Sequence, residues 1–185
     1  MINAERIVRE LDSRLDHAVN LVLYGRAALA LAFPNAPDAI KHSLDVDAII
    51  PMSLQTTFLG DEQFWNAQQL TNKVLHSDGL YITHLFEAKG VFLRRDWESE
   101  IVPVPLPGLR WLKLQRPATL DLVLTKMMRG NDPQDMADAK FLIEQGRITK
   151  TQLIKAFPEM QPFQFVELED AFKRAKPLVL EMAFD

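Results

Sequence analysis

Two aspartates, Asp45 and Asp47, are the side chains whose type and spacing point most directly to chemistry. They stand in the run SLDVDAIIP, residues 43–51, which is typical of a β-strand closed by a proline. Because side chains alternate across a strand, positions 45 and 47 face the same side. Two carboxylates that close repel each other unless a cation lies between them, and Mg²⁺ prefers such oxygen ligands. The spacing therefore predicts a magnesium site at Asp45 and Asp47.

A glycine turn upstream of the aspartates is a candidate phosphate-binding site. Residues 19–24 read as a strand that ends at Gly25, and a small-residue helix over residues 26–33 begins with Arg26. The first backbone N–H groups of a helix attract phosphate, and glycine lets a ligand approach the turn closely. We therefore expect Gly25 and Arg26 to contact phosphate. The alternatives are a plain turn glycine and an arginine that pairs with a surface acid.

Composition limits the classes of function. The chain has 185 residues, 48% of them hydrophobic, which is enough for one well-buried domain with or without a small helical appendage. A net charge of −4 argues against non-specific nucleic-acid binding through overall charge, although a local basic groove stays open. The absence of cysteine excludes disulfides and thiolate metal sites. Residues 1–16 show no apolar signal core, and we expect a soluble cytoplasmic protein that does not enter a membrane.

Hydrophobic periodicity predicts an α+β fold, with a small mixed sheet and flanking helices followed by a helical C-terminal half. The predicted helices cover residues 2–17, 26–33, 61–75, 118–129, 133–145, 150–157 and 166–182, and the predicted strands cover 19–24, 44–50 and 80–86. The stretch before Lys41 is expected to be an exposed polar loop. Prolines 103, 105 and 107 argue against a long central strand, so the extended candidates are expected at the sheet edge; they are residues 91–93, 101–104 and 109–114. After Pro117 all predicted elements are helices. This change suggests domains 1–116 and 117–185, or one compact fold with a helical half.

Three stretches in this order carry a resemblance to a known family. They are LYGRAAL at residues 23–29, SLDVD at residues 43–47, and LVLTKMMR at residues 122–129 followed by DMAD at residues 135–138. Together they resemble the nucleotidyltransferase superfamily with the fold of DNA polymerase beta, and more narrowly the bacterial proteins related to AbiEii toxins. The resemblance covers residues 19–145. It implies a glycine-containing phosphate turn, an Asp-x-Asp metal motif, a lysine-bearing helix and a following Asp-x-x-Asp helix.

The resemblance assigns roles to side chains in the C-terminal half. Lys126 is implied to bind the triphosphate, although a lysine beside an apolar helix face also fits a snorkelling role. Asp132 with Pro133 is explained by helix capping alone, and Asp135 fits either a helix start or a site. Asp138 lies one turn later and the cap does not explain it, so it is the better site candidate. The short connection at residues 130–131 predicts a contact between Lys126 and Asp138.

The third acid of the family marks a departure in this sequence. Family members carry it on a later strand, where it activates the attacking hydroxyl. The matching strand here, residues 81–86, contains no acid, and Glu87 follows it directly as the candidate third metal ligand. The family turn also carries Gly-Ser or Gly-Gly where this chain has Arg26. His42 and His84 are the histidines nearest the expected site, and a loop histidine such as His42 is more often plain surface.

The function implied by the resemblance is Mg²⁺-dependent transfer of a nucleotidyl group from an NTP to a hydroxyl acceptor, with release of pyrophosphate. The acceptor would be RNA, for example tRNA, or protein, and the chain would be the toxin of a toxin–antitoxin pair with a cognate antitoxin. The alternatives are a catalytically weak relative that binds a nucleotide or a partner without turnover, and an antitoxin-like scaffold. The C-terminal helix is expected to serve internal contacts or a homodimer surface.

Overall fold

The computed structural model describes the backbone of residues 1–185 and every side chain except that of His84, so the expectation for that histidine lies outside the described residues. The chain divides into two compact units. Unit 1 comprises Met1–Ala88 and Val102–Arg116, and unit 2 comprises Lys89–Ile101 and Pro117–Asp185. One boundary coincides with the division expected after residue 116. Residues 89–101, expected in the first domain, belong instead with the helical unit.

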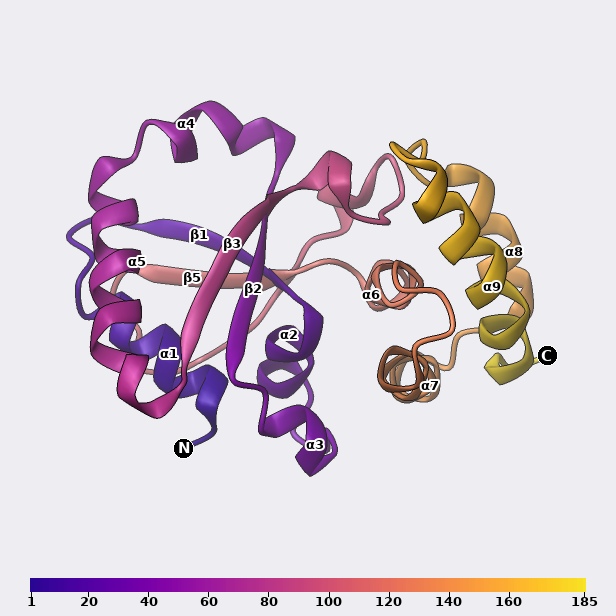
Figure 1. Ribbon diagram of the computed structural model, residues 1–185, viewed down its shortest axis with the longest axis horizontal. Coiled ribbons are helices and arrows are strands. Elements are labelled where there is room, and N and C mark those ends of the chain that lie inside the picture. The colour runs from indigo at the N-terminus through magenta and orange to yellow at the C-terminus, as the bar shows by residue number, and fades with distance from the viewer. The chain divides into compact units, whose positions relative to one another are not determined.

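Unit 1 is built on a five-stranded mixed sheet in the order β3-β2-β1-β5-β4. Its strands are β1 Val19–Tyr24, β2 Asp45–Ile50, β3 Tyr81–Glu87, β4 Val102–Pro103 and β5 Leu112–Arg116. β1 runs antiparallel to β2 and parallel to β5, β2 runs parallel to β3, and β4 runs antiparallel to β5. Figure 1 shows β1 beside β5 and β2 beside β3. The predicted α+β class with a mixed sheet and flanking helices is therefore confirmed.

Helices cover the apolar side of this sheet. The helices of unit 1 are α1 Asn3–Asp12, α2 Gly25–Ala32, α3 Asp38–Lys41, α4 Gln55–Leu59 and α5 Glu62–Leu75, with 3₁₀ turns at Met52–Leu54 and His76–Asp78. Alternation along β1 and β2 buries Leu21, Leu23, Val46 and Ala48. α1 and α2 pack against β2, and α5 packs against β3. The other face of β2 carries Asp45 and Asp47.

Side chains of α5 cover the outer edge of β3. Asn72 donates to the carbonyl of Ile82 at 2.9 Å and accepts from the Ile82 N–H at 2.7 Å. Gln68 donates to the carbonyl of Thr83 at 3.0 Å. An edge strand with unpaired backbone groups invites pairing with another chain, and these amides occupy that edge. They also fix β3 beside β2, which places Thr83 next to the aspartates.

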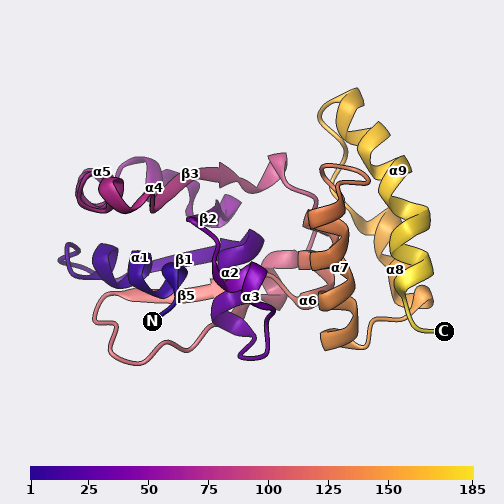
Figure 2. The ribbon, with the colours of Figure 1, turned by 60° about the horizontal axis from the view of Figure 1, so that its bottom comes forward.

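Unit 2 is helical. Its helices are α6 Thr119–Thr125, α7 Pro133–Gly146, α8 Lys150–Ala156 and α9 Val166–Met182, with 3₁₀ turns at Trp97–Glu100 and Phe157–Glu159. α7 packs against both α6 and α9 (Figure 2). Asp132 caps α7 by accepting from the Asp135 N–H at 3.0 Å, and Pro133 is the first helical residue, as predicted.

The segment Lys89–Ile101 belongs to unit 2 because its side chains and backbone bond there. The Asp121 carboxylate, fully buried, accepts from the Arg94 backbone N–H at 2.9 Å and from its guanidinium at 2.7 Å. The guanidinium also pairs with Glu100 at 2.7 Å. The Leu93 carbonyl accepts from the Gln161 N–H at 2.9 Å. The contacts of Arg94 with Asp121 and of Leu93 with Gln161 are distant in sequence, so local periodicity did not reveal them.

Two predicted helices end earlier than expected. α1 ends at Asp12 rather than residue 17, and the Asp12 carboxylate accepts from the backbone N–H groups of residues 110–112. α6 ends at Thr125 rather than residue 129, so Lys126 is its C-cap and not an interior residue. After α6, backbone hydrogen bonds between residues three positions apart continue as far as Met128. Gly130 then has a positive φ of 70°, which turns the chain toward α7.

Three further predictions about extended and loop segments were wrong in part. The stretch before Lys41 contains the short helix α3. Residues 91–93 form no strand, because their contacts are with unit 2 rather than with the sheet. β5 lies between β1 and β4 and not at the sheet edge, since Leu112–Arg116 follows the prolines and keeps its backbone N–H groups. Within the described residues, no helix is both long enough and apolar enough to span a membrane.

Candidate functional site

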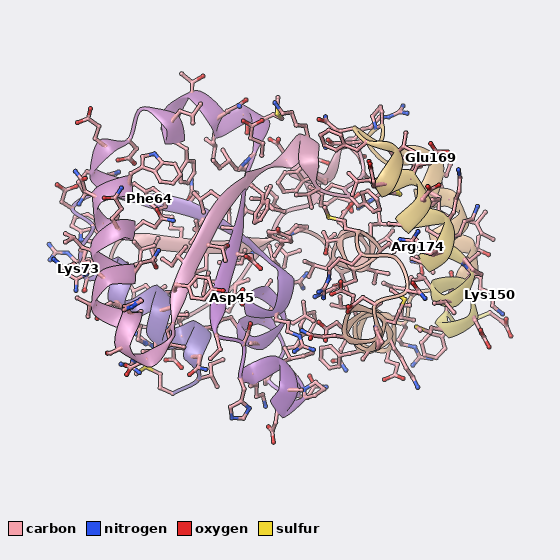
Figure 3. The ribbon with its side chains drawn as sticks, in the orientation of Figure 1. Asp45, Phe64, Lys73, Lys150, Glu169 and Arg174 are labelled. Carbon is pink, nitrogen blue, oxygen red and sulfur yellow. The ribbon has the colours of Figure 1, made fainter. Side chains whose placement is uncertain are left out.

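Asp45 and Asp47 share the face of β2 that is not buried under the helices. Both carboxylates are half-buried, whereas the alternate residues Val46 and Ala48 have no exposed surface. Figure 3 labels Asp45 near the start of β2. The predicted alternation is therefore present, and the two acids lie side by side on one strand.

Gly25 lies against Asp47 at the end of β1. Tyr24 pairs with Asp47 across the antiparallel strands, so the residue after Tyr24 begins α2 beside the carboxylate. A Cβ added to Gly25 would stand 3.0 Å from Asp47 Oδ2, and Gly25 has a φ of +64°. Glycine is required here both for its backbone conformation and for the space. Tyr24, the N-cap residue of α2, makes no side-chain capping hydrogen bond, and the first residue of the helix, Gly25, lies beside the Asp47 carboxylate.

Hydroxyl groups hold the two carboxylates in place. Ser43 Oγ donates to Asp45 Oδ1 at 2.8 Å, and the Thr83 hydroxyl donates to Asp47 Oδ1. Burial raises the pKa of the Tyr24 phenol well above its usual value, and the negative charges of Asp47 and Asp45 raise it further. Tyr24 is therefore a neutral neighbour of the acidic pair at physiological pH.

Thr83 occupies the position on β3 that neighbours Asp47. Glu87, the predicted third ligand, is instead paired with Ile50 in the parallel register of β2 and β3. Three residues along β2 separate Ile50 from Asp47, a distance of about 10 Å. Because Ile50 is an odd number of positions from Asp47, strand alternation places Glu87 and Asp47 on opposite faces of the sheet. Glu87 as a metal ligand stays a prediction, and its side chain would have to reach both back along the strand and to the other face.

The donor set at Asp45 and Asp47 fits Mg²⁺ held jointly with phosphate. Among the side chains that the structure describes, no group of three or more histidines and carboxylates is arranged to hold a metal ion. Mg²⁺ is commonly bound through only one or two carboxylates, with water and substrate phosphates completing its shell. Asp45 and Asp47 supply the carboxylates, and the turn at Gly25 approaches Asp47 closely.

Arg26 and His42 lie near α3. The Arg26 guanidinium donates to the Ala39 carbonyl at 3.1 Å, so one of its donors is directed to the chain itself. The His42 ring contacts the Asp38 carbonyl at 2.7 Å on an exposed turn. Phosphate contact by Arg26 stays a prediction, and the surface interpretation of His42 agrees with its exposure.

The remaining predicted residues form an ion cluster within unit 2. Lys126 Nζ lies 2.8 Å from Asp138 Oδ2 and 3.3 Å from Asp135 Oδ1, and all three side chains are buried. Arg129 pairs with Asp135 and, at 3.2 Å, with Asp132. The predicted contact between Lys126 and Asp138 is therefore confirmed. The cluster ties α6 to α7, and the roles of Lys126, Asp135 and Asp138 toward a nucleotide stay predictions.

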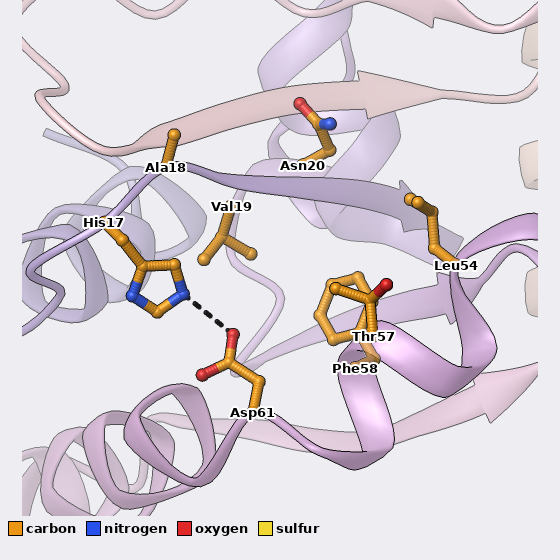
Figure 4. Close-up of a pocket in the computed structure, with 8 residues that line it drawn as sticks. All are labelled: His17, Ala18, Val19, Asn20, Leu54, Thr57, Phe58 and Asp61. Atoms are coloured by element: carbon orange, nitrogen blue, oxygen red, sulfur yellow. Dashed lines mark hydrogen bonds and ion pairs between the residues drawn. The ribbon is translucent and has the colours of Figure 1, made fainter.

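A separate cavity lies at the opposite end of β1. It has a volume of about 110 Å³ and is lined by residues 17–20 together with Leu54, Thr57, Phe58 and Asp61 (Figure 4). His17 Nε2 lies 2.8 Å from Asp61 Oδ2, and His17 Nδ1 lies 2.8 Å from Asp16 Oδ1. Hydrogen bonds to Asp16 and Asp61 raise the pKa of His17 above its ordinary value. Both ring nitrogens are engaged, so this histidine joins β1 to the start of α5.

Three residues beside the aspartates were missed from the sequence. Ser43 stands two positions before Asp45, so strand alternation would have placed it on the same face. Thr83 and Tyr24 could be found only from the strand order and register, because neither is close to Asp47 in sequence.

Comparisons with protein-family models, with curated proteins and with solved structures found no match to this chain.

Proposed function

We propose that unit 1 binds a Mg²⁺–NTP complex at Gly25, Asp45 and Asp47 and transfers its nucleotidyl group to a hydroxyl acceptor. The observation that carries the proposal is the approach of the Gly25 turn to Asp47, with 3.0 Å between a notional Cβ and the carboxylate oxygen. The start of α2 after β1, where Tyr24 makes no side-chain capping hydrogen bond, and two carboxylates on one face of the adjacent strand β2 suit a phosphate and its cation.

The proposed reaction makes one bond to phosphorus and breaks another. The acceptor hydroxyl gives up its proton to water or to Glu87, and its oxygen bonds to the α-phosphorus. The bond from that phosphorus to the bridging oxygen breaks, and pyrophosphate leaves with the electron pair. Mg²⁺ bound with the nucleotide would supply positive charge for the phosphate oxygens. Asp45 and Asp47 would hold that ion, and the first N–H groups of α2 would orient the phosphates. RNA or protein would be the acceptor, as in a toxin with a cognate antitoxin.

A second candidate function is nucleotide or partner binding without transfer. It is favoured by Thr83, which neighbours Asp47 on β3 where a transferase of this kind would carry an acid to take the acceptor proton. Under this alternative the protein binds an Mg²⁺–NTP complex as a sensor or as part of a protein pair. The choice between the two functions depends on whether Glu87, which is paired with Ile50 in the register of β2 and β3, takes the acceptor proton.

The binding test is titration calorimetry of ATP, CTP, GTP and UTP with Mg²⁺ into wild type and the double variant Asp45→Asn/Asp47→Asn. We expect binding to the wild type and loss of binding to the variant, since both metal-facing carboxylates are removed. Asp16→Asn is the matched control, because Asp16 is an exposed acid near the other end of β1. Its nucleotide binding should match the wild type, and its thermal unfolding should change only slightly, through loss of the Asp16–His17 ion pair. Equal heats in the wild type and the double variant would refute the proposal.

Transfer is tested separately with NTPs labelled at the α-phosphate, incubated with total cell RNA and total cell protein. Label that becomes covalently attached, and is lost in the double variant, supports the transferase. Binding without attached label supports the second function. Glu87→Gln then tests the third acid: a transferase that uses Glu87 loses labelling while keeping NTP affinity.

A further inference from the structure

An exposed aromatic ring lies on the same sheet face as the aspartates. Phe86 is paired with Ile49 in the parallel register, and Ile49 is two residues from Asp47, so Phe86, Ile49 and Asp47 share one face. Phe86 is 40% exposed, although it lies within β3 and not on a loop. A large apolar ring that stays exposed beside a charged site is a candidate contact for a ligand.

Tyr24 connects this ring to the glycine turn. The Tyr24 and Phe86 ring centroids are 5.5 Å apart with an interplanar angle of 84°, an edge-to-face pair. Tyr24 also faces Asp47 across the strands and directly precedes Gly25. The aromatic pair therefore begins one residue from the turn that we assign to phosphate, and Tyr24 supports the Phe86 ring by an edge-to-face contact.

We propose that the exposed ring of Phe86, supported by Tyr24, is the stacking surface for the base of the bound NTP. This inference rests on the proposed nucleotide function of the same site and adds its base contact. Stacking on an aromatic side chain tolerates every base because every base has a π face, and a purine offers more area than a pyrimidine. The site should therefore accept all four NTPs and prefer ATP and GTP over CTP and UTP.

The test compares Mg²⁺–ATP, Mg²⁺–CTP and Mg²⁺–tripolyphosphate by calorimetry on the full chain. Tripolyphosphate carries the phosphates without a base. Wild type should bind ATP more tightly than CTP, and CTP more tightly than tripolyphosphate. Phe86→Leu should weaken ATP binding at least about fivefold, the lower end of the measured range for one stacked base, and leave tripolyphosphate binding unchanged.

Two further variants complete the test. Phe86→Tyr keeps an aromatic ring and should retain ATP affinity. Phe165→Leu removes another exposed phenylalanine ring, 65% exposed and in unit 2, and should behave as wild type. Thermal unfolding of each variant checks that it folds.

The outcomes separate this inference from the function beneath it. Equal binding of ATP and tripolyphosphate by wild type, or unchanged ATP binding by a folded Phe86→Leu variant, overturns the stacking surface while the phosphate and metal site stands. Failure of wild type to bind any of the three ligands overturns the proposed function and the stacking surface together. A loss of affinity in Phe165→Leu equal to that in Phe86→Leu would also overturn the assignment to Phe86.

Discussion

The acidic pair on β2 in unit 1 and the paired acids of unit 2 differ in burial. In unit 2, Asp121 pairs with Arg94 and Asp138 pairs with Lys126, with each acid almost fully buried. In unit 1, the half-buried Asp45 and Asp47 accept hydrogen bonds from the hydroxyl groups of Ser43 and Thr83.

The difference separates a structural role from a binding role. A carboxylate buried during folding costs several kcal/mol unless a cation is buried with it, which is the arrangement around Lys126 and Arg94. Carboxylates at a surface keep their hydration, and two of them on one strand attract a cation from solution. We therefore expect substitutions in the unit 2 cluster to change stability first, and substitutions at the glycine turn to change ligand binding as well.

The largest expected effect is the loss of Lys126. Lys126→Met leaves the buried Asp138 without its lysine, and breaking a buried ion pair on one side costs about 3–5 kcal/mol. Because the chain has two units, hydrogen–deuterium exchange of residues 119–146 is the measurement that assigns the loss to unit 2. Exchange of β1 and β2 should change little.

Lys173→Met is the matched control for this variant. Lys173 pairs with Glu169 and Asp170 on the exposed surface of α9, where solvent screens the interaction. Equal exchange in the two variants would mean that the Lys126 cluster does not stabilise unit 2. The same protein also tests the predicted triphosphate role, because a folded Lys126→Met variant that binds Mg²⁺–ATP like wild type excludes it.

The next effect is expected at the glycine turn. Gly25→Ala adds a Cβ 3.0 Å from Asp47 Oδ2 and imposes a side chain on a φ of +64°, which costs about 1–2 kcal/mol in itself. The carboxylate must move away from the turn, so Mg²⁺–ATP binding should weaken about tenfold or more, the equivalent of one charge-assisted hydrogen bond. Thermal unfolding and calorimetry measure the two effects.

Gly79→Ala isolates the contribution of the contact. Gly79 has a similar φ of +67°, and a Cβ there would meet nothing within 4 Å. Both variants bear the backbone cost, whereas only Gly25→Ala displaces Asp47. If the two variants lose the same stability and both keep nucleotide affinity, the approach of the turn to Asp47 has no functional meaning.

The features that the sequence revealed are local ones. The alternation of Asp45 and Asp47 and the Asp132–Pro133 cap each depend on residues within four positions, so strand and helix geometry was enough to predict them. The contact of Lys126 with Asp138 followed from the short connection between two helices. Gly25 was located for the same reason, because a glycine between a strand and a helix marks a turn.

The features that the sequence did not reveal depend on strand order and on distant contacts. Thr83 reaches Asp47 only because β3 lies parallel to β2 in a particular register, and Phe86 meets Tyr24 for the same reason. Residues 89–101 attach to unit 2 because Arg94 pairs with Asp121, 27 positions away. Such pairings are set by tertiary energetics, which hydrophobic periodicity does not contain.

The smallest expected effect is the pH dependence of stability that comes from His17, which forms an exposed ion pair in unit 1. Its imidazole lies between Asp16 and Asp61, and its pKa is raised above 6.5, first by the hydrogen bond to Asp16 and then by that to Asp61. A raised pKa in the folded state means that the stabilisation is complete below the unfolded value and is lost as the pH rises through the folded value. Because the His17 side chain is 42% exposed, the loss should be small.

The measurement is the midpoint of thermal unfolding from about pH 5.5 to about pH 8.5, the range in which histidine titrates. Wild type should lose a small part of its stability toward the upper end, and His17→Gln should lose less across the same range. His76→Gln, which alters an exposed histidine in the 3₁₀ turn after α5, serves as the control and should follow wild type. The same pH dependence in His17→Gln and wild type would show that this pair, unlike the buried ion pairs of unit 2, contributes nothing measurable.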